Sequence, residues 1–543
     1  MMDRPLQLKS LLWRAERIFG DKKIVTRVDD SFVSYSYADY GRRVRRLASA
    51  LSELGVSPGD RVGTLCWNTF EHYEAYFAVP CIGAVLHTIN TRLSCEQISY
   101  IINHARDKVL IISPDQVPTV ERMGDALSSV ETFIILGFPS ASASRLRSTQ
   151  IYEDLIASGD ENFDLQDIDE RSAAGMCYTS GTTGEPKGVL YSHRSTVLHA
   201  LMLCLNGSIG VSESERYLLV TPMSHVNSWG MPFACALQGA TLVLPGVQPR
   251  PADYLKAIEH ESVSVCVAAV SVGMLMREEI ESNTRTYDLS SLKTLWLGGQ
   301  APPVSEMRWW NDRYHTEVVQ GWGMTESSPL LTFTTLKDKF LHASEEERYK
   351  LLSRQGLPLP LVEMKVVNDR GEEQPWDAQS AGEILVRSPW VARSYYNDPR
   401  SQESFQDGWF RTGDVGHIDP EGYLSLVDRT KDLIKSGGEW ISSVDLENAL
   451  MAHPAVREAA VVAVADPTWL ERPVAYVSTR SPVEASELAG LVLSRFPKFW
   501  VPDQFIFVDE VPKTSVGKFD KKALRQRLAS LEESVTTDAS LPG

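Results

Sequence analysis

The chain has 543 residues, of which 43% are hydrophobic and 23% are charged, and its formal net charge is −17. This length and composition predict a folded protein with several domains' worth of sequence, and they exclude disorder for most of the chain. The acidic balance excludes a nucleic-acid partner, because phosphate backbones require a basic surface.

Seven cysteines occur, with no C-x-x-C pair, which is typical of proteins in a reducing compartment. The N-terminus lacks a basic region followed by an apolar core, so no signal peptide is predicted. The longest nearly apolar run, 263–276, is too short to span a bilayer. We therefore expect a cytoplasmic protein without a membrane span.

The first part of the chain alternates short apolar strands with amphipathic helices. Two strands are expected between 23 and 33, and helices are expected over 37–54, 71–82 and 95–104, with buried strands at 62–65 and 85–89. The alternation resumes with helices at 195–206 and 251–261 and strands at 217–220, 241–244 and 263–268. Repeated strand–helix units of this kind predict parallel sheets.

The pattern changes after residue 361 to short strands separated by turns, at 363–368, 382–387 and 422–427. A helix (444–453), two strands (458–464, 472–478) and a second helix (484–495) follow. We predict an N-terminal domain over 1–430 with a β-rich subdomain at about 355–430, a C-terminal α+β domain over 431–530, and a disordered tail over 531–543.

One loop carries the clearest chemical signal. Tyr178–Val189 is rich in glycine and hydroxyl residues, follows the apolar run 173–177, and contains Lys187. Glycines let backbone N–H groups turn toward an anion, hydroxyls add donors, and the lysine adds positive charge, so the composition suits a polyphosphate. It is not a Walker loop, because Lys187 precedes Gly188 rather than serine or threonine. A short glycine- and serine-rich stretch alone is more often a surface turn.

These twelve residues resemble the phosphate loop of the adenylate-forming superfamily, which comprises acyl-CoA synthetases, adenylation domains and luciferases. Further motifs follow in the family's order, at 222–230, 297–302, 320–326, 409–414, 433–440 and 512–520. The resemblance implies two doubly wound α/β subdomains and a β-rich subdomain, followed by a small mobile C-terminal domain. It also implies that ATP, Mg²⁺ and coenzyme A are used with a small carboxylic acid.

The resemblance assigns roles to particular residues. The catalytic residues would be Lys518, Glu326, Thr182 and His225, with Glu326 also binding Mg²⁺. Taken alone, Glu326 and Lys518 would more often be solvated surface charges. The hinge between the domains maps to Lys431. The ATP-binding residues would be Thr179, Ser180, Gly181, Thr182, Thr183, Gly184, Lys187, Gly299, Gln300, Ala301, Gln320, Gly321, Trp322, Gly323, Thr325, Asp414 and Arg429.

The same resemblance places the acyl pocket and the coenzyme A contacts. The acyl pocket would be formed by Ser224, His225, Trp229, Gly298, Gly299 and Trp322. The coenzyme A contacts would be Ser436, Gly437, Gly438, Glu439 and Trp440. His225 and Trp229 taken alone are more often ordinary core residues, and the segment 433–440 alone is a hairpin turn.

His225, Trp229 and Trp322 make the chain similar to medium-chain fatty acyl-CoA ligases and methylthiopropionate-CoA ligases. Relatives usually carry phenylalanine where this chain has Ser224, so a bulkier branched, cyclic or aromatic acid is the alternative substrate. A stand-alone adenylating enzyme that loads a carrier protein is a second alternative, since both acceptors end in pantetheine. A non-catalytic nucleotide-binding relative would not need Glu326 and Lys518. A homodimer is an expectation from fatty acyl relatives.

Overall fold

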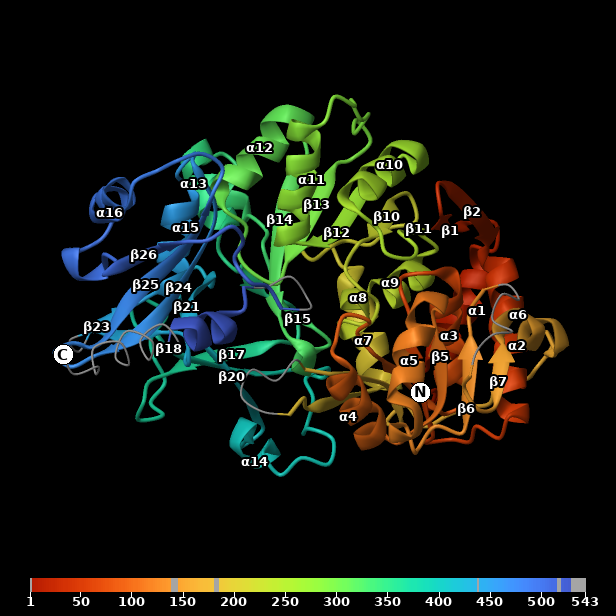
Figure 1. The fold of residues 1–543 in the computed structure, drawn as a ribbon. Helices are drawn as coiled ribbons and strands as arrows, with labels where there is room; N and C mark the ends of the chain where they lie inside the picture. Colours follow the sequence, from red (N-terminus) through yellow and green to blue (C-terminus); the bar gives the residue numbers. More distant parts are fainter. Residues whose placement is uncertain (1, 138–144, 180–184, 437–438, 515–518, 529–543) are drawn as a thin grey trace, which may run out of the picture.

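The computed structural model describes residues 2–137, 145–179, 185–436, 439–514 and 519–528 (Figure 1). These residues form four β-sheets. Two large sheets with helices make up the N-terminal part, a small β-rich sheet follows, and an α+β unit, coloured blue, lies beside it. The predicted fold class is confirmed.

The first sheet carries the predicted phosphate loop at one edge. Its strand order is β7-β6-β5-β3-β4-β8-β9, and all neighbours are parallel except β8 and β9. Parallel neighbours need crossover helices, which α3 (Phe70–Cys81), α4 (Cys95–Ala105) and α5 (Val117–Met123) provide. The strands are β3 (Arg61–Leu65), β4 (Val85–Thr88), β5 (Asp107–Ile112), β6 (Thr132–Ile135), β7 (Thr149–Ile151), β8 (Ala173–Tyr178) and β9 (Gly188–Ser192).

The second sheet has the order β16-β15-β14-β13-β12-β10-β11-β1-β2. The N-terminal hairpin joins it through β1, whose Ile24 pairs in parallel with Leu242 of β11. The strands are β1 (Lys23–Val28), β2 (Ser31–Ser36), β10 (Arg216–Leu219), β11 (Thr241–Leu244), β12 (Val265–Ala269), β13 (Thr294–Gly298), β14 (Glu317–Gly323), β15 (Leu330–Phe333) and β16 (Leu357–Pro358). Helices α10 (Pro251–Glu261), α11 (Val270–Ser282) and α12 (Val304–Tyr314) accompany this sheet (Figure 1).

The largest core lies between these two sheets. It combines strand residues of both sheets with α3 and with α1 (Leu8–Ile18), α2 (Tyr37–Glu53), α7 (His193–Leu203) and α9 (Met231–Gln238). Helix α2 begins at Ser36, whose hydroxyl accepts from the Asp39 N–H in a capping box. Its Tyr40 stacks on Tyr73 of α3 with ring centroids 4.6 Å apart. This shared core fixes the position of each sheet against the other.

The β-rich sheet and the C-terminal unit complete the fold. The former contains β17 (Glu363–Val367), β18 (Gly382–Arg387), β19 (Phe405–Gln406), β20 (Trp409–Ile418) and β21 (Leu424–Arg429). The latter contains β22 (Ile434–Ser436), β23 (Glu439–Ile441), α15 (Ser443–Met451), β24 (Val456–Asp466), β25 (Leu470–Thr479), α16 (Ala485–Leu493), β26 (Gln504–Phe507) and a helix at 521–528. Shorter helices are α6 (Tyr152–Ser158), α13 (Glu345–Leu352) and α14 (Ser401–Ser404), while the segment α8 (Val226–Trp229) is a left-handed turn.

The local predictions agree closely with the observed elements. The helix expected at 37–54 is α2, the one at 95–104 is α4, and the strand at 85–89 is β4. In the part of the chain that the structure describes, no helix is both long and apolar enough to cross a bilayer.

Candidate active site

The predicted phosphate loop connects two antiparallel strands at the edge of the first sheet. The Thr179 N–H donates to the Lys187 carbonyl (2.9 Å), and the Lys187 N–H donates to Thr179 Oγ1 (3.4 Å). These bonds close the base of the loop beyond β8 and β9. Ser180, Gly181, Thr182, Thr183 and Gly184 lie outside the described residues.

One aromatic side chain lies between Lys187 and the predicted magnesium ligand Glu326. The Lys187 ammonium is 4.4 Å from the centroid of the Tyr395 ring, a cation–π contact. The Tyr395 hydroxyl donates to Glu326 Oε1 (2.7 Å). Burial and the neighbouring Glu326 raise the pKa of Tyr395, so this hydroxyl remains a donor. Tyr395 is not among the residues predicted from the sequence, because a lone tyrosine in a loop after β18 carries no periodic or motif signal.

The backbone around Glu326 is tied to neighbouring segments. The Ala392 N–H donates to the Glu326 carbonyl (2.7 Å), and the Tyr191 hydroxyl donates to the carbonyl of Thr325 (2.8 Å). A Cβ at Gly323 would collide with the carbonyl of Pro329, so the β14–β15 connection needs a glycine there. Contacts with Tyr191, Ala392 and Pro329 thus hold the backbone around Glu326 in place.

The predicted nucleotide residues Asp414 and Arg429 are paired. They are register partners on β20 and β21, and Arg429 Nε lies 3.1 Å from Asp414 Oδ1. Asp414 raises the pKa of Arg429. The Trp322 indole N–H donates to Asp414 Oδ2 (2.8 Å). Asp414 Oδ1 accepts no well-aligned hydrogen bond within the described residues, although it is buried.

Other predicted nucleotide residues lie on β14 or after β13. Gly299 has φ +92°, a conformation that glycine adopts without strain, and Gln300 and Ala301 follow it half-buried. Gln320 is buried, and its side chain donates to the Leu352 carbonyl (3.0 Å). A Cβ at Gly321 would lie 2.5 Å from Leu330 Cδ1, so the tight pairing with β15 requires a glycine.

The predicted acyl-pocket residues Trp229 and Gly298 are in direct contact. A Cβ at Gly298 would lie 2.6 Å from Trp229 Cη2, so the missing side chain makes room for the indole ring. The Trp229 ring packs edge-on against Trp296 with centroids 5.0 Å apart. Ser224 is buried and His225 is half-buried at the start of this segment.

An unusual backbone turn orients Trp229. Residues 226–229 all have positive φ, between 46° and 57°, and Gly230 continues with 79°. Each non-glycine residue in this left-handed region costs roughly 1–2 kcal/mol, so surrounding contacts must stabilise the turn. One such contact is the buried Ser228 hydroxyl, which donates to the Thr221 carbonyl (2.8 Å). Strain of this kind clusters at functional sites.

The predicted hinge and coenzyme A segments lie at the start of the C-terminal unit. Burial lowers the pKa of Lys431. Ser436 is buried and its hydroxyl accepts from Arg472 Nη1 (3.1 Å), whereas Trp440 is 42% exposed, with the Lys435 ammonium 4.6 Å from its ring centroid. Gly437, Gly438 and Lys518 lie outside the described residues. The backbone of Glu439 pairs with Ser436 between β22 and β23.

The sequence was compared with known families and proteins. The model for AMP-binding enzymes matches residues 12–396, and the model for the AMP-binding enzyme C-terminal domain matches residues 445–518. The chain belongs to this family. Similar curated proteins are named CoA ligases, and this chain is an acid–thiol ligase.

Several curated relatives match over nearly their whole length. The chain is 44% identical over 534 residues to a long-chain-fatty-acid–CoA ligase of Thermus thermophilus, covering 97% of this chain and 96% of the relative. It is 40% identical over 537 residues to a medium-chain-fatty-acid–CoA ligase of Ectopseudomonas oleovorans (98% and 97% covered). It is 41% identical over 530 residues to a 3-methylmercaptopropionyl-CoA ligase of Ruegeria lacuscaerulensis (97% and 98% covered).

Solved structures of the family share the fold of this AMP-binding enzyme. A crystal structure of an anthranilate CoA ligase in complex with anthranoyl-AMP has a TM-score of 0.85 at 25% identity, covering 97% of this chain and 99% of that one. The o-succinylbenzoate CoA synthetase of Bacillus subtilis, in complex with its acyl-adenylate, has a TM-score of 0.78 at 27% identity, covering 96% and 98%.

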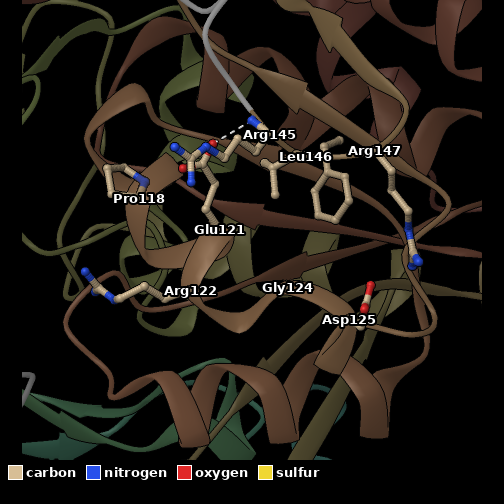
Figure 2. A pocket seen from close by; sticks show the side chains of 9 residues that line it. Pro118, Glu121, Arg122, Gly124, Asp125, Arg145, Leu146 and Arg147 are labelled. Carbon is tan, nitrogen blue, oxygen red and sulfur yellow. Dashed lines mark hydrogen bonds between the residues drawn. The ribbon is translucent and has the colours of Figure 1, made fainter.

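A separate hollow of about 470 Å³ lies beside α5 (Figure 2). Its lining includes Arg122, Asp125 and Arg147, and the Arg145 N–H donates to Glu121 Oε1 (2.7 Å), drawn as the dashed line. Among the residues that the structure describes, none of those predicted to bind ATP, the acyl group or coenzyme A lines it. We assign it no role in the reaction.

Proposed function

We propose that this AMP-binding enzyme activates a carboxylic acid with ATP and transfers the acyl group to coenzyme A through an acyl-adenylate. A carboxylate is a poor electrophile because its oxygen is a poor leaving group. Attack of the carboxylate on the α-phosphorus of ATP releases pyrophosphate and turns that oxygen into part of AMP, a good leaving group. The coenzyme A thiol then attacks the acyl carbon, and AMP departs.

The contact chain Lys187–Tyr395–Glu326 is the observation that carries this proposal. It brings a cation and a carboxylate together at the base of the phosphate loop. Lys187 can neutralise phosphate charge, and Glu326 offers oxygen to a hard cation. Groups of three or more histidine, cysteine, aspartate or glutamate ligands are absent from the described residues. A single carboxylate suits Mg²⁺, which usually keeps several water ligands and is bound by one or two protein carboxylates together with phosphate oxygens of the substrate. When bound, Mg²⁺ would offset negative charge on the triphosphate.

The paired Asp414 and Arg429 would bind the nucleoside. We infer that the buried, weakly bonded Asp414 Oδ1 accepts from ribose hydroxyls, and that Trp322 and Arg429 hold this carboxylate in place. Lys518 would approach the α-phosphate in the first half-reaction only. A positive charge there would stabilise the charge that develops during displacement.

The division of labour is tested with Lys518→Ala. We expect ATP–pyrophosphate exchange to fall by at least roughly 100-fold, the scale for loss of a group that stabilises developing charge. Conversion of supplied acyl-AMP to acyl-CoA should stay within about twofold of wild type. Lys522→Ala, at an exposed neighbouring lysine, is the matched control. Equal losses in both half-reactions would contradict the assignment.

We propose a medium-chain fatty acid as the acyl substrate, supported by Trp229 and Trp296, which form an aromatic wall beside Gly298. One relative is named for medium-chain fatty acids, and others are named for long-chain fatty acids and for 3-methylmercaptopropionate, so together they support a linear acid. A bulkier acid is the alternative substrate, because Ser224 leaves more space than the phenylalanine that relatives usually carry at this position. AMP release that depends on coenzyme A, measured across linear, aryl and polycyclic acids, separates the two. Activity confined to linear acids would remove the enlarged-pocket alternative.

The acyl acceptor and the cellular compartment of the enzyme are also proposals. Competition between coenzyme A and a phosphopantetheinylated carrier protein in one assay tests the acceptor, and we expect coenzyme A to be preferred. All seven cysteines are free thiols, which supports a reducing compartment such as the cytoplasm. The Lys431 hinge and the domain boundary at 430 stay predictions, as does a homodimer.

A further inference from the structure

A buried polar cluster underlies the base of the phosphate loop and takes no part in the chemistry proposed above. Its first half is a pair of side chains from β4 and β5. Nδ1 of His87 lies 2.8 Å and 2.9 Å from the two carboxylate oxygens of Asp107, and both side chains are fully buried.

This pair spans an intervening strand. In the sheet, β3 lies between β4 and β5, and its Gly63 is the register partner of His87. A Cβ at Gly63 would lie 2.7 Å from Asp107 Oδ2. Because Gly63 has no side chain, the Asp107 carboxylate can cross β3 at this position and reach His87.

The second half of the cluster is Tyr178, the last residue of β8 and the first residue of the predicted phosphate loop. The His87 ring lies 5.1 Å from the Tyr178 ring, and His87 Nε2 is buried without a hydrogen-bond partner among the described residues. The Tyr178 hydroxyl lies 2.6 Å from Nδ1 of His104 on α4, within hydrogen-bond distance. Burial lowers the pKa of His104, so its neutral ring can accept this hydrogen bond.

Tyr178 in turn packs on the far end of the loop. It is the strand partner of Gly188, and a Cβ at Gly188 would lie 3.1 Å from Tyr178 Cζ. The Gly188 carbonyl accepts from the Tyr396 N–H (2.8 Å), and the Tyr396 ring stands edge-on to His104 at 5.7 Å. Both ends of the phosphate loop thus rest on a surface whose orientation the cluster determines.

We propose that Asp107, His87 and His104 are positioning residues that fix the Tyr178 ring and thereby set the geometry of the phosphate loop and its affinity for ATP. The proposal rests on the function proposed for that loop. A buried polar pair adds little net stability compared with apolar residues of the same shape. What hydrogen bonds do supply is a defined ring orientation, which a loop that binds phosphate through backbone N–H groups needs.

Two surface-proximal variants test the hydroxyl contact. Tyr178→Phe removes one oxygen and keeps the ring, and His104→Ala removes its acceptor. Each should raise the KM for ATP about fivefold in pyrophosphate exchange, the effect of one lost hydrogen bond. The KM for the acid should stay within about twofold, because the contacts described for Trp229 and Gly298 involve Trp296 and each other, not this cluster. Since both variants break the same contact, the double variant should be no worse than the worse single variant.

A conservative variant and an apolar replacement complete the test. His104→Asn offers an oxygen near the position of Nδ1 and should recover most of the ATP affinity. His87→Phe with Asp107→Leu replaces the buried pair by apolar groups and should fold, yet still raise the KM for ATP. Unchanged ATP affinity in this folded double variant and in Tyr178→Phe would overturn the proposal, as would equal changes in the KM values for ATP and acid.

Direct titration of each variant with ATP separates this proposal from the proposed function. Wild-type protein that binds ATP without exchanging pyrophosphate would contradict the proposed reaction, while weaker ATP binding by the variants would still support the positioning role. Wild-type exchange accompanied by unaltered ATP binding in all variants would contradict the positioning role alone.

Discussion

Tyr395 contacts both charged side chains that the proposed chemistry needs at the phosphates. Its ring faces the Lys187 ammonium and its hydroxyl bonds to Glu326. The contact restricts the carboxylate to one orientation before any ligand arrives. Preorganised charge of this kind costs no rearrangement when a polyphosphate binds.

Removing the Tyr395 hydroxyl should therefore weaken the nucleotide site. We expect Tyr395→Phe to raise the KM for Mg²⁺–ATP roughly tenfold, because hydrogen bonds to charged groups contribute about 1.5–3 kcal/mol. The KM for the acid should not change. Tyr349→Phe is the control, since its hydroxyl makes no hydrogen bond among the residues that the structure describes. An unaltered KM for ATP would mean that Glu326 is positioned by its backbone alone.

Gly298 offers a second test at residue scale. In Gly298→Ala the new methyl group would meet the Trp229 ring, which is itself packed on Trp296. Overpacking of this kind costs about 1–3 kcal/mol, so kcat/KM for the acid should fall roughly tenfold or more while the KM for ATP is retained. Gly490→Ala on α16 meets nothing within 4 Å and should raise stability by up to about 1 kcal/mol. Equal kinetics in both variants would remove Trp229 from the acyl pocket.

At the scale of elements, the helix at 521–528 connects the loop that bears Lys518 to the predicted hinge. Lys521 Nζ lies 2.8 Å from Glu447 Oε1 and donates to the Ser443 hydroxyl, which in turn donates to Asp428. One turn further on, Arg525 pairs with Asp432. Burial alone would raise the pKa of Asp432, but Lys521 and Arg525 outweigh it and lower that pKa.

Breaking this cluster should affect one half-reaction more than the other. Lys521→Met leaves buried carboxylates without their cation, so we expect a loss of about 3 kcal/mol in stability. Because the helix is only three residues from Lys518, pyrophosphate exchange should fall several-fold more than thioester formation from supplied acyl-AMP. Melting temperatures and both half-reaction rates provide the measurement. Lys521→Arg should recover most of the loss, and a parallel decline in both rates would show that the cluster only stabilises the fold.

At the scale of the whole molecule, the core between the two large sheets holds histidines away from water. Burial lowers the pKa of His199 to about 3, well below its ordinary value of 6.5. Below pH 6.5 the His199 ring therefore binds a proton in the unfolded chain but stays neutral in the folded protein until the pH approaches 3. Stability contributed by the neutral ring is present above pH 6.5 and is lost progressively as the pH falls toward 3.

His199→Gln should remove this dependence. Between pH 6.5 and 4.5 the wild type should lose stability relative to the variant by roughly 1.4 kcal/mol per pH unit, the value for one proton. Thermal melts of both proteins across that range provide the test. His260→Gln, at an exposed ring, should follow the wild type. Parallel curves for wild type and His199→Gln would show that His199 is protonated in the folded state.

The local elements and the order of the site motifs can be predicted from the sequence. Helix α2 and strand β4 follow from hydrophobic periodicity, and the phosphate loop follows from its glycines, hydroxyls and lysine, because these signals depend on residues close together in the chain. The family resemblance added roles for Glu326 and Asp414.

Which distant segments contact one another depends on the tertiary structure. No local pattern indicates that β1 pairs with β11, that Tyr395 bonds to Glu326, or that Asp107 reaches His87 over Gly63. Periodicity records which side of a strand or helix is buried, but not the partner that buries it. Those partners depend on the packing of the whole core. Crossover connections bring distant strands together, and glycines leave room for the side-chain contacts that orient the site.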